Sequence, residues 1–144
     1  MGPSKRALFH GACAMAFAVF LAAAWGQDAS SHVARRKISC KNSENAATCY
    51  WAHGRLSAYN GTPTFRLWKI GSKRIVAIHS GPGYQRGSDQ ENEDPEMPAN
   101  VERALKPFEN VVFADFEICP LDPEHAGEMQ SVCIESAKKI ITDP

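Results

Sequence analysis

The dipeptide Asn-Gly at positions 60 and 61 is the strongest hairpin signal in this chain of 144 residues. Both residues readily adopt the positive φ angles that a tight antiparallel turn requires. The dipeptide separates two stretches rich in β-forming residues, 49–59 and 64–70, and a second short turn leads to a third such stretch, 74–79. The sequence therefore predicts a three-stranded antiparallel meander.

The middle of the chain changes character after the third predicted strand. Residues 80–98 are rich in glycine, proline and acidic side chains and have no apolar periodicity, so we expect a long surface loop. Residues 98–106 are predicted to form two helical turns, because Val101, Ala104 and Leu105 fall on one helix face. A proline at position 107 ends this run.

Two more predicted strands complete the chain, residues 111–119 and residues 130–134, the latter extended by residues 139–142. The order βββ-α-ββ, with a bend or bulge at Gly54 in the first strand, is typical of the five-stranded OB-type barrel. Closing the sheet would also remove exposed strand edges. We therefore expect residues 49–144 to form a single small OB-like barrel, mainly β with one short helix. An SH3-like barrel or an open α+β sheet is the alternative.

The N-terminus has the order of a secretory signal peptide. Two basic residues at positions 5 and 6 precede an apolar run, residues 7–24, that ends in small side chains. The run approaches the length of about 20 residues that a membrane span needs, but His10 and the small residues favour cleavage, which we place after Gly26, with Ala24 as the alternative. We therefore expect residues 1–26 to be removed, leaving a secreted or periplasmic protein without a membrane span.

The predicted mature chain begins with a polar segment, residues 27–48, that lacks periodicity and is expected to be a flexible N-terminal arm. The whole chain holds 16 basic and 16 acidic residues, and the predicted leader takes away two of the basic ones. Because the remaining net charge is slightly negative, the composition argues against a nucleic-acid partner.

Four cysteines follow the predicted leader, and an even number of cysteines in an exported protein favours disulfides. Cys119 and Cys133 are centred on a stretch rich in turn-forming residues, 122–127, so two strands folding back there would bring them opposite each other. The sequence therefore predicts a Cys119–Cys133 disulfide and, by exclusion, a Cys40–Cys49 disulfide. The other two pairings of four cysteines stay open.

No motif of a cofactor or metal site occurs in the sequence. The GxSxG, Walker and Rossmann patterns and the CxxC and HxxxH pairs are all absent. Residues 61–67 are similar to a strand of the thermonuclease family in which Arg66 would be the catalytic arginine, but Gly71 and Arg74 stand where that family has carboxylates. We therefore expect no nuclease activity, no cofactor and no metal.

One enzymatic alternative remains. The residues His53, Asp115 and Glu117 are types that serve as general acids and bases. If the fold gathered them in a pocket, the chain would be a small secreted hydrolase with an unrecognised site.

Several short patterns are spread over the predicted mature chain. They are HGRLS-x-YNGTP over residues 53–63, DF-x-x-CP over residues 115–120 and MQ-x-VC-x-ESA over residues 129–137. Together they resemble a group of small, exported, uncharacterised bacterial proteins. The resemblance implies export and a common fold, and it brings no reaction, cofactor or catalytic residue.

The second predicted strand suggests a binding surface. Phe65 and Leu67 point to one side of this strand and make a natural core pair, which leaves Arg66 and Trp68 on the outside. Trp and Arg are the side chains most often found as anchors at protein interfaces. We therefore expect a non-catalytic binding module for a protein, glycan or envelope component, with a binding face formed by Arg55, Arg66, Trp68 and Arg74.

Overall fold

The computed structural model describes residues 38–144, which hold five strands, one α-helix and two 3-10 turns. The strands are β1 (Tyr50–Ala58), β2 (Phe65–Lys69), β3 (Ile75–Ile78), β4 (Val111–Pro120) and β5 (Gln130–Asp143). The helix is α1 (Ala99–Ala104), and the 3-10 turns are η1 (Ala46–Thr48) and η2 (Asp89–Asn92). The predicted signal peptide, residues 1–26, and residues 27–37 of the predicted arm lie outside the described residues. None of the described helices is both long and apolar enough to cross a membrane.

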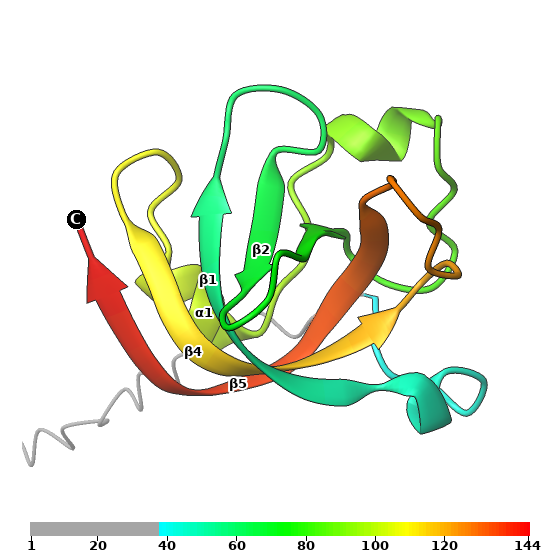
Figure 1. Ribbon diagram of the computed structural model, residues 1–144, viewed down its shortest axis with the longest axis horizontal. Coiled ribbons are helices and arrows are strands. Elements are labelled where there is room, and N and C mark those ends of the chain that lie inside the picture. Colours follow the sequence, from blue (N-terminus) through cyan, green and yellow to red (C-terminus); the bar gives the residue numbers. More distant parts are fainter. Residues whose placement is uncertain (1–37) are drawn as a thin grey trace, which may run out of the picture. The chain divides into compact units, whose positions relative to one another are not determined.

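The five strands form one closed barrel in the order β1-β2-β3-β5-β4, with β4 pairing back to β1 (Figure 1). The pairing of β3 with β5 is parallel and the other pairings are antiparallel. Between β3 and β4 the chain runs through a long loop and α1. The prediction of a small, mainly β, five-stranded OB-like barrel with one short helix is confirmed.

The interior of the barrel is filled by alternate residues of the strands. Phe65 and Leu67 of β2 are buried, as the alternation predicts. The short helix α1 adds the fully buried side chain of Val101 to the same core. Met97 also belongs to this core, so the prediction that residues 80–98 are surface throughout is wrong at their C-terminal end.

Of the bend or bulge expected at Gly54, the bulge is absent, and β1 is a continuous, curved strand (Figure 1). The pairing of β1 with β4 continues through Gly54 without a register shift, and the pairing of β1 with β2 begins at Gly54. A Cβ atom at this position would lie 2.6 Å from Cδ1 of Leu67, well inside the separation at which carbon atoms pack. It would also lie 3.0 Å from the Trp68 carbonyl oxygen, which belongs to the backbone and cannot turn aside, so this close approach favours glycine.

β5 is one continuous strand over the two segments that the sequence suggested. Its register against β4 shifts twice, between Phe113 and Asp115 and between Glu117 and Ile118. At the first shift Lys139 has a positive φ of 55°, as the extra residue of a β-bulge often does. Each bulge inverts the alternation of inward and outward side chains, which explains why the sequence pattern divided this strand.

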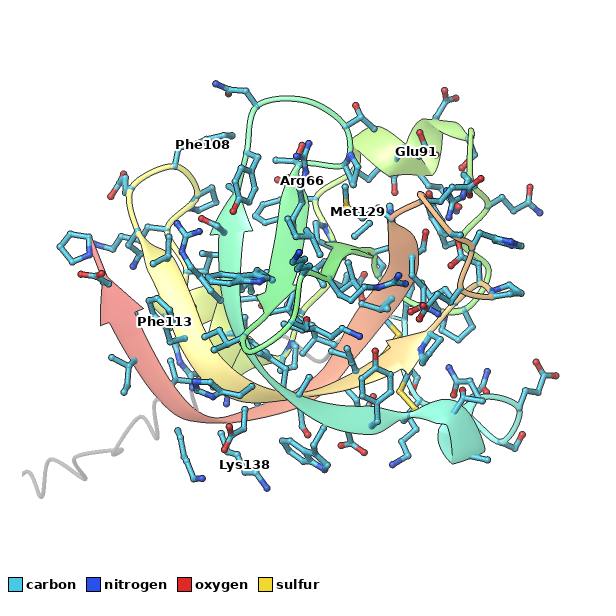
Figure 2. The ribbon with its side chains drawn as sticks, viewed as in Figure 1. Arg66, Glu91, Phe108, Phe113, Met129 and Lys138 are labelled. Atoms are coloured by element: carbon cyan, nitrogen blue, oxygen red, sulfur yellow. A yellow bond between two sulfur atoms is a disulfide. The ribbon has the colours of Figure 1, made fainter. Side chains whose placement is uncertain are left out.

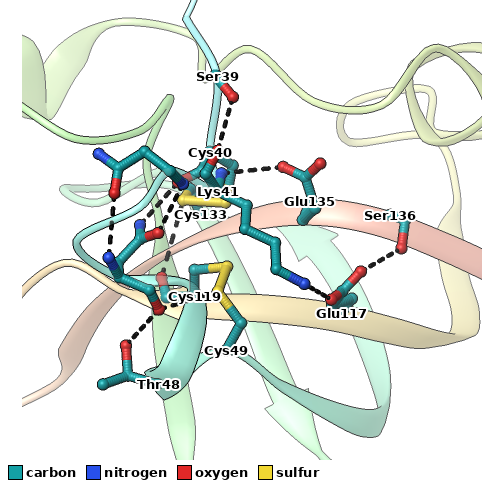
Figure 3. The surroundings of a disulfide bond; sticks show 12 residues. Ser39, Cys40, Lys41, Thr48, Cys49, Glu117, Cys119, Cys133, Glu135 and Ser136 are labelled. Atoms are coloured by element: carbon teal, nitrogen blue, oxygen red, sulfur yellow. Dashed lines mark hydrogen bonds and ion pairs between the residues drawn. A yellow bond between two sulfur atoms is a disulfide. The ribbon is translucent and has the colours of Figure 1, made fainter.

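The predicted disulfide pairing is wrong. Cys119 and Cys133 are direct cross-strand partners on β4 and β5, but the bonds join Cys40 to Cys133 and Cys49 to Cys119 (Figure 3). Paired residues on neighbouring strands project from the same face side by side. Cys49 directly precedes β1, whose first residue pairs with Ile118, so it lies beside Cys119. Cys40 lies on the preceding segment, where it is fully buried against Cys133. Disulfides of this kind are typical of proteins in oxidising compartments.

Residues 38–48, which the sequence assigns to a flexible arm, are fixed to the barrel. Cys40 is fully buried. The Lys41 N–H donates a hydrogen bond of 3.0 Å to Glu135, and the Lys41 ammonium lies 2.7 Å from Glu117 (Figure 3). The Asn45 side chain donates to the Cys40 carbonyl oxygen over 2.7 Å. The folded unit therefore includes this segment, and the predicted boundary at residue 49 is wrong.

Candidate functional site

Three of the four residues of the predicted binding face lie close together on the outside of β1 and β2. Arg55 is the cross-strand partner of Trp68. Arg66 precedes Trp68 by two residues on β2, so both side chains leave the same face. Trp68 is 39 % exposed. The structure thus gathers Arg55, Arg66 and Trp68, and their role in binding stays a prediction.

The Trp68 row, as we name it, is a line of outward side chains that crosses all five strands. Its members are successive cross-strand partners, one from each strand: Ile75, Trp68, Arg55, Phe113 and Ile141. At about 4.8 Å per strand, the row spans roughly 19 Å around the barrel. Ile75 is 44 % exposed and Ile141 66 % exposed, whereas Arg55 and Phe113 are half-buried.

Two cations beside Trp68 are held by Tyr59 rather than by carboxylates. The Arg55 guanidinium donates to the Tyr59 hydroxyl over 3.3 Å, and the Arg66 guanidinium lies 5.1 Å from the centre of the Tyr59 ring. Arg66, which is labelled in Figure 2, also donates to the Pro63 carbonyl oxygen over 2.9 Å. Within residues 38–144 neither guanidinium forms an ion pair. Their positive charge is therefore available to a partner.

Arg74, the fourth predicted residue, is placed differently. It lies just before β3, and its guanidinium forms an ion pair of 2.6 Å with Glu124 of the β4–β5 hairpin. Because this carboxylate neutralises the charge, Arg74 offers less to a partner than Arg55 or Arg66 does.

Two of the three residues of the hydrolase alternative, His53 and Asp115, meet on the outside of the barrel. His53 Nδ1 lies 2.9 Å from Asp115 Oδ1, and Lys139 contacts the other carboxylate oxygen of Asp115 over 2.9 Å. The hydrogen bonds from Lys139 and His53 hold the pKa of Asp115 below its ordinary value. Glu117 is bonded to Lys41 and Ser136 instead. Among the described residues, the interactions of the His53–Asp115 pair include no serine, threonine or cysteine that could act as a nucleophile.

Arg86 fastens the long β3–α1 loop to the β4–β5 hairpin. Its guanidinium donates to Asp122 over 2.7 Å, to Glu128 over 3.1 Å and to the Met129 carbonyl oxygen over 3.1 Å. Asp122 also accepts the Ser131 N–H over 2.9 Å. Burial alone would raise the pKa of Asp122, but the hydrogen bonds from Arg86 and Ser131 outweigh burial and hold it below its ordinary value.

Beneath this loop His79 and Tyr84 form a stacked pair. Their ring centres lie 3.6 Å apart at an interplanar angle of 22°. His79 is only 5 % exposed, and burial lowers its pKa from the ordinary 6.5 to about 4. The imidazole is therefore neutral at physiological pH.

Glu91 closes the loop around this pair. One of its carboxylate oxygens accepts the Gly87 N–H over 2.6 Å and the Tyr84 hydroxyl over 3.2 Å. The bond from the Gly87 backbone is the main reason that the pKa of Glu91 lies below its ordinary value. The loop thus presents an ionised carboxylate next to a neutral imidazole.

Sequence reasoning missed this group of residues because it assigned residues 80–98 to a solvated loop from composition alone. The residue types in this stretch nevertheless indicate a loop that is anchored to the barrel. Tyr84 and Arg86 are an aromatic and a forked cation inside a glycine-rich stretch, directly after a strand that ends in His79. Such side chains can anchor a loop to the body of a domain by stacking and by bidentate hydrogen bonding.

Replacing Arg86 with lysine is expected to loosen the loop while the barrel stays folded. Lysine keeps the charge but loses the fork that reaches several acceptors at once. The ion pairs of Arg86 with Asp122 and Glu128 are partly exposed, so we expect the free energy that holds the loop closed to fall by roughly 1 kcal/mol. The amides of residues 84–91 should then exchange their hydrogens about fivefold faster. The control Arg103→Lys changes an exposed arginine on α1. Equal exchange in both variants would contradict the anchoring role of Arg86.

The fold and these contacts define a small disulfide-linked OB-like barrel with an exposed Trp–Arg surface and an anchored loop. Comparisons of the chain with protein-family models, with curated proteins and with solved structures gave no match.

Proposed function

We propose that this protein is an exported, non-catalytic binding module whose Trp68 row docks a partner protein. The observation that carries the proposal is the continuity of the row, in which one outward residue of each strand is paired with the next. Large apolar side chains exposed together in this way are typical of interaction surfaces. The two disulfides and the signal-like residues 1–26 support export to an oxidising compartment.

The chemistry of the row favours a protein over a glycan or a small molecule. Aromatic residues and arginine are enriched at the centres of protein interfaces, and Trp68 and Arg55 lie next to each other in the row. Among the carboxylates of the described residues, none is paired with Arg55 or Arg66. The partner is therefore expected to present acidic side chains beside an apolar patch, so that the two surfaces are complementary in charge.

The decisive variant is Trp68→Ala. A partner captured from the envelope fraction with the full-chain protein and then purified should bind the variant at least about 30-fold more weakly, because central interface tryptophans contribute about 2 kcal/mol or more. Isothermal titration measures this ratio. The double variant Arg55→Ala, Arg66→Ala is expected to slow association and to reduce its dependence on salt.

The chain offers a matched control in Trp51→Ala. Trp51 is 47 % exposed on the same strand as Arg55, but it is paired with Glu117 and lies beneath the Lys138 ammonium, away from the row. The Trp51→Ala variant should therefore bind the partner as tightly as the wild type does. If Trp68→Ala binds the purified partner as tightly as Trp51→Ala does, while near-ultraviolet circular dichroism shows an intact fold, the proposed face is wrong.

A further inference from the structure

A cleft opens outside β3 and β5, where three loops of the described chain meet. We name it the His79 cleft. Its volume is about 180 Å³. Figure 2 shows Glu91 and Met129, two residues of its lining, near the same end of the barrel. The floor and walls include Ala77, His79, Ser131, Pro63, Tyr84 and Met129.

The ring of His79 has an unused hydrogen-bonding capacity. Neither of its nitrogens has a hydrogen-bond partner among residues 38–144, although the residue is 5 % exposed. Buried polar groups are nearly always hydrogen-bonded to protein, water or a ligand. The same residue also lines a smaller hollow of about 100 Å³, together with Ile38 and Glu93. His79 therefore presents a donor and an acceptor to whatever occupies these spaces.

The other polar atoms of the cleft are mainly acceptors. The Tyr84 hydroxyl donates its proton to one oxygen of Glu91 and is also hydrogen-bonded to the Ser131 side chain. The second Glu91 oxygen has no partner among the hydrogen bonds of the described residues. The terminal nitrogens of Arg86, by contrast, already donate to acceptors of the β4–β5 hairpin.

The charges around the cleft are predominantly negative. The single positive charge of Arg86 is set against the carboxylates of Glu91, Asp122 and Glu128. The next cation, Arg66, is directed to the Pro63 carbonyl oxygen and the Tyr59 ring. Arg86 is the cation of the lining, and carboxylates already neutralise it, so an anion would gain little there. A sugar hydroxyl would bring as many acceptors as donors. A ligand with a positive charge and several N–H donors matches the lining best.

We propose that the His79 cleft binds an aliphatic ammonium group, which donates hydrogen bonds to His79 and Glu91 and lays its alkyl stem against Pro63 and Met129. The ammonium belongs either to a free amine or to a lysine side chain of another protein. This site is distinct from the Trp68 row, and neither proposal depends on the other.

The test is a titration of the full-chain, disulfide-bonded protein with butylammonium chloride at neutral pH, followed through the ring nitrogen resonances of His79. A saturable shift in the millimolar range is expected. Tetramethylammonium has the charge without N–H donors, butanol has the stem without the charge, and acetate is an anion. Each should leave the His79 resonances unchanged. N-acetyl-lysine methylamide presents the same group on a peptide backbone, so its affinity relative to butylammonium distinguishes the two sources.

Two variants separate the site from the fold. His79→Phe keeps a ring for stacking on Tyr84 but removes both nitrogens, and its binding is followed through the Tyr84 ring resonances. Glu91→Gln keeps an oxygen for Gly87 and Tyr84 but removes the charge. Each should weaken butylammonium binding about tenfold or more, since hydrogen bonds to charged groups are the stronger ones. The control Asp94→Asn removes an exposed carboxylate from the same loop and should bind normally.

Saturable binding of the two ammonium probes, absent for the other compounds and weakened in both variants, supports the proposal. The proposal is overturned if butylammonium gives no saturable shift, if tetramethylammonium or butanol produces the same shift, or if the folded variants bind as the wild type does.

Discussion

Exchanging Cys40 and Cys133 together for alanine is expected to lower the free energy of unfolding by about 4.5 kcal/mol. The two residues are 93 positions apart in the sequence. In the chain-entropy account a disulfide stabilises by restricting the unfolded chain, and the effect grows with the length of the closed loop. Removing the Cys49–Cys119 bond, whose ends are 70 positions apart, should cost nearly as much. Since a small domain has only about 5–15 kcal/mol in total, either loss is large.

Denaturant titration under oxidising conditions measures both losses. The pairing itself is checked by digestion without reductant, which should release one peptide joining Cys40 to Cys133 and another joining Cys49 to Cys119. A peptide that joins Cys119 to Cys133 would contradict this connectivity. The mismatched variant Cys119→Ala, Cys133→Ala is a useful comparison, because it breaks both bonds at once and should be less stable than either matched double variant.

The strands and the helix could be predicted because their signals are local. Residues 64–70 alternate between inward and outward side chains, and the predicted helix at residues 98–106 contains α1. The parallel pairing of β3 with β5 and the closure of β4 on β1 join segments far apart in the sequence. No local pattern indicates these two pairings, and the OB-like barrel expected from the element order implies only that the sheet closes.

The disulfides show why local reasoning fails for such features. The turn at residues 122–127 correctly places Cys119 opposite Cys133, yet the bonding partners depend on which segment covers that face. Nothing in the polar composition of residues 38–48 reveals that they lie over β4 and β5. The prediction by exclusion then carried the error to Cys40 and Cys49.

The Trp68 row and the His79 cleft also differ in how much of each the sequence indicates. The neighbours Arg66 and Trp68 follow from alternation on one strand, whereas the complete Trp68 row depends on the registers of all five strands. The His79 cleft depends on contacts between loops, such as those from Arg86 to the β4–β5 hairpin. Sequence composition describes the residue types in these loops, and only the fold determines which of them meet.

The buried imidazole of His79 is expected to make the stability of the domain fall as the solution becomes mildly acidic. Its pKa is about 4 in the folded protein and 6.5 ordinarily. Between these pH values the unfolded chain holds more protons on this residue than the folded one does. Its contribution is therefore complete above about pH 6.5 and decreases as the pH falls towards about 4, by about 3 kcal/mol in all.

Denaturant titrations at about pH 7 and about pH 4.5, compared between the wild type and His79→Phe, measure this contribution. Phenylalanine cannot be protonated but can still stack on Tyr84, so the variant should lose most of the difference in unfolding free energy between the two pH values. The carboxylates of Glu91 and Asp122 have lowered pKa values. Their contributions to the free energy of unfolding are therefore lost mainly at more acidic pH. The control His125→Gln replaces an exposed histidine of the β4–β5 hairpin and should behave as the wild type does. If His79→Phe retains the full pH dependence, the imidazole is not the group that links folding to protons in this range.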